Sequence, residues 1–234
     1  MEAYPGHENA DVVLGAAVDD MYDMQEFERA ITYAHRLIES YPSADLPIRR
    51  AAWTVIAHSS FDLAAYPQAE DAYIRVLAMT GDEDEGRPAL IDNLAASIYK
   101  QGEQANVMED YRAAANHFLR IREVAPTSNI RAAAEYDAAA ALMRLEDWAT
   151  AGNVLESFRD AFPEHEQAVP VRTDAARALF ENGDLDRAID QARRVVGSPT
   201  PAAPEYLRTA WLVIGHASFD RQDFASSESA YVAV

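Results

Sequence analysis

The most regular pattern in the chain is a large apolar residue followed three positions later by a small one. Positions three and four apart lie on one face of a helix, so each pair predicts a helix that sets a bulky side chain beside a gap for its neighbour. The pair occurs at Phe27/Ala30, Tyr66/Ala69, Tyr111/Ala114, Trp148/Ala151, Leu185/Ala188 and Phe224/Ser227. Proline, which ends a helix, follows several of the pairs, at Pro42, Pro126, Pro163 and Pro199.

A second helical pattern lies upstream of each pair. It consists of a large residue, an apolar residue three positions later and a small residue directly after that. A fourth residue follows three positions after the small one. In the second unit these are Trp53, Ile56, Ala57 and Ser60. The small residue lets two helix backbones approach closely. Together the two patterns predict an all-α chain of paired helices.

The same stretch of sequence recurs far along the chain. Residues 51–62 contain Trp53, His58, Phe61 and Asp62, and the same residue types return in register 158 positions later, within residues 209–220. That offset corresponds to four units of about 40 residues, a period typical of helical solenoids. We therefore predict six units, of which the sixth is incomplete.

These motifs resemble the tetratricopeptide repeat (TPR), whose pattern is Trp, Leu-Gly and Tyr, followed by Ala, Phe and Pro. The resemblance covers residues 11–234 and implies a right-handed α-solenoid of stacked helix hairpins. The long helices and the Tyr41-Pro42, Ala125-Pro126 and Phe162-Pro163 pairs are similar to those of a narrower branch. This branch comprises TPR proteins of the Gram-negative cell envelope, such as the Tol–Pal accessory protein and the outer-membrane assembly lipoproteins. It implies a bacterial protein of the periplasm or envelope.

The two ends of the chain carry separate expectations. Residues 1–10 show no periodicity and contain Pro and Gly, so we expect a flexible tail, followed by a single solenoid domain over residues 11–234. The sixth unit stops at Val234 within its second helix, where Phe224 and Tyr231 give no polar cap. We therefore expect a fragment of a longer protein whose last unit self-associates. The third unit has about seven extra residues around positions 104–110, which predict two more helical turns.

Composition excludes several classes of function. The sequence has 39 acidic and 20 basic residues and a net charge of −19, which opposes binding to nucleic acid or anionic lipid. It has no cysteine, and no apolar run approaches the roughly 18 residues of a membrane span, so we expect no direct membrane insertion. The N-terminal residues do not resemble a signal peptide. Motifs for phosphate binding, zinc hydrolysis and serine nucleophiles are missing from the sequence, so we expect no enzyme, no cofactor and no metal.

Two features allow a metal-binding interpretation, and in both a structural one is favoured. Residues 81–86 hold four consecutive acids between two glycines, but Asn93 stands where a calcium loop starting at Asp82 needs a bidentate glutamate. The acids suit a solvated loop before a helix that begins near Arg87. His58 and His216 lie four units apart, too far to share one ion, and are predicted to line a groove instead.

The resemblance implies that the first helix of each unit turns one side to a concave groove. The residues that we expect there are His58, Phe61, Tyr99, Lys100, Tyr136, Met143, Arg144, Arg177, Phe180, His216 and Phe219. Their aromatic and Met members would receive apolar side chains of an extended peptide, and the three cations its acidic groups. Alternatively, the rings pack against adjacent first helices, and the cations pair with Asp92, Asp137, Asp174 or Glu181.

Two functions follow from these observations. The first is a protein-binding scaffold that holds a peptide or helix of a protein partner in the groove. The second is a structural subunit of a larger envelope assembly, which would make contacts through the edges and ends of the solenoid.

Overall fold

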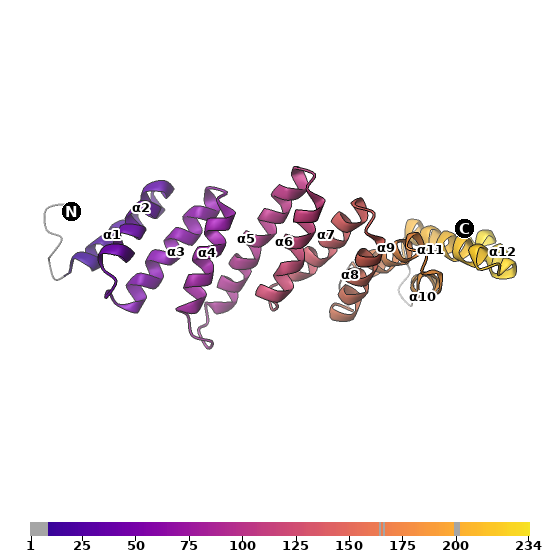
Figure 1. The fold of residues 1–234 in the computed structure, drawn as a ribbon. Helices are drawn as coiled ribbons and strands as arrows, with labels where there is room; N and C mark the ends of the chain where they lie inside the picture. Colours follow the sequence, from indigo (N-terminus) through magenta and orange to yellow (C-terminus); the bar gives the residue numbers. More distant parts are fainter. Residues whose placement is uncertain (1–8, 164, 166, 199–201) are drawn as a thin grey trace. The chain divides into compact units, whose positions relative to one another are not determined.

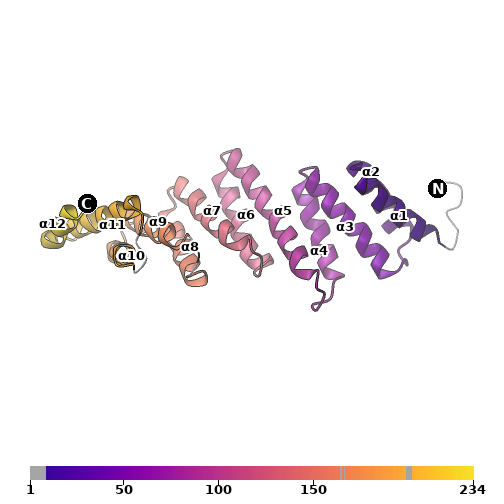
Figure 2. The same ribbon diagram turned by 180° about the vertical axis from the view of Figure 1, so that it is seen from behind.

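The computed structural model describes residues 9–163, 165, 167–198 and 202–234, which form α-helices joined by short turns (Figures 1 and 2). Most of the predicted tail, residues 1–8, lies outside this part of the chain, and the first helix already begins at Ala10. In the described residues there are twelve helices: α1 (Ala10–Asp23), α2 (Phe27–Ser40), α3 (Leu46–Asp62), α4 (Tyr66–Ala78), α5 (Arg87–Val107), α6 (Tyr111–Val124), α7 (Arg131–Arg144), α8 (Trp148–Ala161), α9 (Ala168–Glu181), α10 (Leu185–Val196), α11 (Pro204–Asp220) and α12 (Phe224–Val232). None of the described helices is both long enough and apolar enough to cross a bilayer.

The helices alternate as the first and second members of the six predicted units. Every second helix begins at the large apolar residue of the sequence pattern, from Phe27 in α2 to Phe224 in α12. The extra residues of the third unit lengthen its first helix: α5 has 21 residues, whereas α1, α7 and α9 have 14 and α3 and α11 have 17. The predicted lengthening is confirmed, and it amounts to about two turns relative to the 14-residue helices and about one turn relative to the 17-residue helices.

The small residue of each apolar–small pair lies in the core. Ala30 and its counterparts in α4, α6, α8 and α10 are fully buried, and Ser227 in α12 is nearly so. The large partner is only half-buried in the first five units and is exposed at Phe224. The close approach of helices thus depends on the small member of the pair. The large member covers the edge of the contact.

The chain divides into two compact blocks, each built from several TPR-like units. The N-terminal block holds residues 1–103 and 120–131, and the C-terminal block holds residues 104–119 and 132–234. In the N-terminal block, α1 packs against α2 and α3, and α3 packs against α2 and α4. In the C-terminal block, α9 packs against α8, α10 and α11, and α11 packs against α10 and α12. Both blocks therefore use one packing rule, in which a first helix contacts its own second helix, the preceding second helix and a neighbouring first helix.

A glycine marks one of the tightest helix contacts in the C-terminal block. A Cβ atom added at Gly152 of α8 would lie 3.1 Å from Cδ2 of Leu179 in α9. Leu179 belongs to a core that it shares with Val195 of α10 and Ile214 of α11. The Leu179 side chain can reach the backbone of α8 here because Gly152 has no side chain.

The turn inside each helix pair has a left-handed residue two positions before the second helix. Among the described residues six have a positive φ, one in each unit: Gln25, Ala64, Glu109, Glu146, Gly183 and Gln222. Two backbone hydrogen bonds close each turn. In the first unit Gln25 N–H donates to Tyr22 O at 2.8 Å and Glu26 N–H donates to Met21 O at 2.9 Å. This is the Schellman arrangement, which satisfies carbonyl groups at the end of the first helix.

An aspartate follows the left-handed residue in the last four units and caps the second helix. Asp147 accepts a hydrogen bond from Thr150 N–H at 3.4 Å and pairs with Arg112 at 3.0 Å. The hydrogen bonds from Thr150, followed by the one from Arg112, lower the pKa of Asp147. Asp110, Asp184 and Asp223 accept N–H groups at the same place in their helices. Each cap therefore helps to fix the residue at which its second helix begins.

The turns predict opposite effects of glycine and alanine. Because a left-handed backbone costs an L-residue energy that glycine avoids, Glu146→Gly should stabilise the protein by about 0.5–1 kcal/mol, and Gly183→Ala should destabilise it by about 1 kcal/mol. No described atom lies near a Cβ added at Gly183, so its substitution changes the backbone contribution alone. Urea unfolding followed by circular dichroism measures both. Glu146→Ala is the control and should be nearly neutral; destabilisation by Glu146→Gly would contradict the assignment.

The Asp147 cap predicts a pH-dependent contribution to stability. Asp147→Ala should cost about 1 kcal/mol at pH 7, as the loss of a helix cap does. Because folding lowers the pKa of Asp147, its contribution is present above the unfolded pKa of about 4 and is lost as pH falls through the folded value. Urea unfolding at pH 7, 5 and 3.5 tests this, with Asp71→Ala on an exposed part of α4 as control. An Asp147→Ala cost that is equal at all three pH values would refute it.

Candidate functional site

Side chains from neighbouring helices surround a hollow of about 220 Å³ in the N-terminal block. His58, Phe61 and Asp62 lie three and four positions apart on α3, so they share one face of that helix. Tyr22 of α1 and Tyr73 of α4 complete most of the wall, and Asn93 of α5 adds to it. We call this site the Tyr22–Asp62 pocket.

His58 is the central ring of the pocket. Its centroid lies 5.9 Å from that of Tyr22 and 5.7 Å from that of Tyr73, both in tilted contacts. Burial lowers the pKa of His58, and the nearby Asp62 carboxylate partly opposes that shift. The imidazole is therefore favoured in its neutral form and leaves the charge of Asp62 uncompensated.

Asp62 gives the pocket its negative charge. The hydroxyl of Tyr22 donates to Asp62 Oδ2 at 3.4 Å, a long hydrogen bond at the surface. Burial, and after it the charge of Asp62, raises the pKa of Tyr22, and burial also raises that of Tyr73. Phe61 meets the ring of Tyr66 edge-on at 5.3 Å, which holds it at the side of the hollow. Asp62 is exposed and lines the hollow together with these rings.

The C-terminal block contains a nearly equivalent site, which we call the Phe180–Asp220 site. His216 of α11 lies 6.0 Å from the ring of Phe180 and 5.5 Å from that of Tyr231, the counterparts of Tyr22 and Tyr73. Phe219 and Asp220 follow as Phe61 and Asp62 do. This site is more open, because Tyr231 is 41% exposed whereas Tyr73 is 3% exposed.

Gly215 accounts for one difference between the two sites. A Cβ at this position would lie 2.8 Å from Cε1 of Tyr231, so only glycine lets that ring approach α11 so closely. There the Tyr231 hydroxyl lies 2.8 Å from His216 Nδ1, within hydrogen-bonding distance. In the Tyr22–Asp62 pocket the equivalent position is Ala57, which is fully buried.

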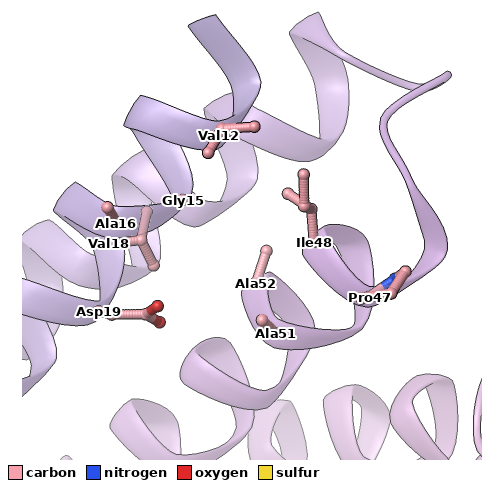
Figure 3. Close-up of a pocket in the computed structure, with 9 residues that line it drawn as sticks. All are labelled: Val12, Gly15, Ala16, Val18, Asp19, Pro47, Ile48, Ala51 and Ala52. Atoms are coloured by element: carbon pink, nitrogen blue, oxygen red, sulfur yellow. The ribbon is translucent and has the colours of Figure 1, made fainter. Parts of the chain in front are cut away.

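A larger hollow of about 350 Å³ lies between α1 and α3 in the N-terminal block (Figure 3). Its walls are apolar apart from Asp19, whose carboxylate extends into the space beside Ala51 and Ala52. Burial, followed by the charges of Asp23 and Asp20, raises the pKa of Asp19. Asp19 and Tyr22 are three positions apart on α1, so the hollow and the pocket are neighbours along the same helix.

The predicted cations have local partners. Lys100 Nζ lies 2.5 Å from Glu103, Arg177 lies 3.5 Å from Asp174, and Arg144 stands over the ring of Tyr111 at 5.5 Å. The Arg177–Asp174 pair is one that the alternative interpretation named.

The structure groups several predicted groove residues of the C-terminal block around one carboxylate. Tyr136 donates a hydrogen bond to Asp174 at 3.0 Å, and Arg177 contacts both Asp174 and Met143 Sδ, the latter at 3.7 Å. Tyr99 and Lys100 lie half-buried on α5 in the N-terminal block. The predicted residues therefore fall into separate local groups, one of which joins α7 and α9.

The acidic loop before α5 is used for internal contacts. Asp84 accepts hydrogen bonds from Arg50 and from the Gly86 N–H, each at 2.9 Å, and Arg87 lies 3.3 Å from Asp82. Asp92, which the alternative interpretation named as a partner for a cation, instead accepts from Ser128 and Asn129. The other acids of the loop stay exposed, which supports the interpretation of residues 81–86 as a solvated loop before α5.

Comparison with known proteins identifies the repeat. A tetratricopeptide-repeat model matches residues 19–44, which contain the end of α1 and all of α2. The structure of BtubC (BKLC) from P. vanneervenii is 15% identical, with a TM-score of 0.50 over 92% of this chain and 88% of that one. The fold is that of a tetratricopeptide-repeat solenoid. TPR proteins are in general scaffolds that bind protein partners.

Other solved structures match this chain at lower identity. A signal-transduction ATPase with a TPR sensor from Pyrococcus horikoshii is 11% identical, with a TM-score of 0.50 over 99% of this chain and 37% of that one. PilW, described as a type IV pilus biogenesis factor, is 13% identical over 96% of this chain and 91% of that one, with a TM-score of 0.44. No curated protein matches the sequence.

Sequence reasoning missed the residues that come to the Tyr22–Asp62 pocket from other helices. Tyr22, Tyr73 and Asn93 are distant from His58 in sequence, and only packing of the TPR units brings them together. A signal existed in the recurrence of Tyr73 as Tyr231, in register with the recurrence of His58 as His216. The same register of 158 positions relates Asp62 to Asp220.

The pocket predicts how the titration of His58 responds to a neutral residue at position 62. Because Asp62 raises the pKa of His58 against the effect of burial, Asp62→Asn should lower that pKa further. The pKa of Tyr22 should fall towards its ordinary value of about 10 in the same variant. NMR titration of side-chain-labelled protein measures both, with Asp71→Asn as control. A rise in the pKa of His58 would contradict the proposed arrangement.

Proposed function

We propose that this TPR chain is a non-enzymatic scaffold that binds a peptide or helix of a protein partner along the side formed by its first helices. One observation carries the proposal. The same group of aromatic, histidine and carboxylate side chains occurs on first helices of both blocks, at His58 and at His216. A recurring group of this kind offers rings for apolar contact and polar atoms for orientation.

The exposure of side chains on the first helices also supports this side of the chain as the binding surface. Phe219 is 56% exposed on α11, although it belongs to an aromatic group that could pack inward. In the C-terminal block the side chains of Arg144 and Arg177 are exposed despite their local partners. Exposed surface ion pairs contribute little to stability, so a partner carboxylate can replace one at small cost. Tyr136, Met143 and Phe180 lie near these cations and provide apolar surface.

A structural role in a larger assembly is favoured by a different observation. Exposed apolar side chains gather on α12, where Phe224 is 60% exposed and Val232 is 84% exposed. A set of apolar side chains on one short helix favours contact between protein edges, including contact with a second copy of the chain. This second function needs α12 and does not need the first-helix side.

Site-specific photo-crosslinking should distinguish the two functions. We expect benzoylphenylalanine at Phe61 or Phe219 to give one partner adduct of the same mass, because both positions lie on the first-helix side. Ile74 on α4 and Ser157 on α8 are exposed second-helix positions and serve as controls that should give none. Adducts are measured by mass spectrometry after irradiation in cells of the source organism.

Crosslinking that occurs mainly at α12 would count against the proposal. Adducts from benzoylphenylalanine at Val232 without any from Phe61 or Phe219 would overturn groove binding and favour an assembly role. An adduct at Val232 with twice the mass of the chain would identify self-association.

A further inference from the structure

The Tyr22–Asp62 pocket lies in an acidic part of the N-terminal block. The neighbouring helix α1 carries Asp11, Asp19, Asp20 and Asp23 and has no lysine or arginine. Asp19 already has a raised pKa, partly because of the other carboxylates on its helix. The charge around the pocket therefore repels an acidic ligand and attracts a basic one.

The basic residues of the adjoining α3 are occupied elsewhere. Arg49 donates to the Ala44 carbonyl at 3.0 Å, and Arg50 pairs with Asp84 at 2.9 Å, both near the start of the helix. Lys100 is held by Glu103, and the hydrogen bond between them raises the pKa of Lys100. Within the part of the chain that the structure describes, Asp62 forms no ion pair.

The shape and chemistry of the pocket suit a cation with an apolar stem. The rings of Tyr22, His58 and Phe61 surround the hollow of about 220 Å³, and the Asp62 carboxylate lies at its edge. Aromatic faces attract guanidinium and ammonium groups and also cover the methylene stem of arginine or lysine. A carboxylate beside them fixes the position of the charge by a charge-assisted hydrogen bond.

We propose that the Tyr22–Asp62 pocket is a specificity site that receives an arginine or lysine side chain of the bound partner, with the cation on Asp62 and the stem against the rings. This inference deepens the proposed function and rests on it, because the side chain belongs to the segment held on the first-helix side.

The Phe180–Asp220 site provides an internal comparison that lacks these properties. Phe180 has no hydroxyl to orient the carboxylate as Tyr22 does, and Tyr231 is engaged with His216. Asp220 is followed by Arg221, which pairs with Asp186 at 2.6 Å, whereas Asp62 is followed by Leu63 and lies near the four aspartates of α1. The two sites therefore share the histidine, phenylalanine and aspartate of the first helix but differ in the ring beside the histidine and in the acidic surroundings, so only the first should select a basic side chain.

A pair of matched peptides tests the proposal directly. The probes are acetyl-Gly-Arg-Gly-amide and its citrulline analogue, which keeps the shape of arginine without the charge. Each is titrated into the full chain with labelled His and Tyr side chains and followed by NMR. We expect saturable shifts at Tyr22 and His58 with the arginine peptide, and binding of the citrulline peptide at least fivefold weaker.

Variants separate the pocket from the general acidity of the protein. Asp62→Asn should weaken binding of the arginine peptide at least fivefold, and Tyr22→Phe should weaken it to a smaller extent. Asp71→Asn removes an equal charge from a second helix and should leave the affinity unchanged. Circular dichroism confirms that each variant keeps its helical content.

Three results would each overturn the proposal. They are equal binding of the citrulline peptide, equal shifts at His216 and His58, and an Asp62→Asn variant that binds as tightly as the parent chain. Failure of the proposed function is recognised separately, because it removes partner adducts at Phe219 as well. If adducts at Phe219 persist while the arginine peptide shows no selectivity for the pocket, only the present inference is wrong.

Discussion

Close approach between helices is the constraint on which the rest of this structure depends. It is possible because a small residue stands fully buried at the same place in the second helix of nearly every unit, as Ala30 does in α2. A larger side chain there would separate the helices and leave voids that neighbouring residues could not fill. The left-handed turn residues serve the same end, since they reverse the chain within three residues and satisfy the helix end by backbone hydrogen bonds.

The candidate site is a consequence of that packing. Once α3 lies against α1 and α4, the face that carries His58 and Asp62 meets a ring from each neighbour, Tyr22 and Tyr73. The same packing in the C-terminal block brings Phe180 and Tyr231 to His216. The repeat therefore produces two sites with one geometry, and the difference between them lies in single residues such as Gly215.

The sequence predicted the helix pairs well because their signals are local and periodic. Phe27 and its counterparts mark the first residue of every second helix, and the lengthening of α5 follows from a simple count of residues. The turn residues escaped prediction because five of the six left-handed positions in the described chain are not glycine, as at Glu146. Contacts such as that of Tyr22 with Asp62 span 40 residues, and no local pattern encodes them. The predicted cations were placed on the right helices, but their partners Glu103 and Tyr111 depend on rotamers that spacing does not determine.

The negative charge of the chain has a specific local effect around α1. A net charge of −19 on a repeat protein repels other acidic molecules in general. On α1 the same excess becomes local, because four carboxylates share one helix without a lysine or arginine, and Asp62 adds a fifth beside aromatic rings. Electrostatic attraction of this kind acts chiefly on association rate and on the choice of partner. The rings supply the short-range contact that a bare acidic surface lacks, and a basic side chain is the ligand that satisfies both conditions.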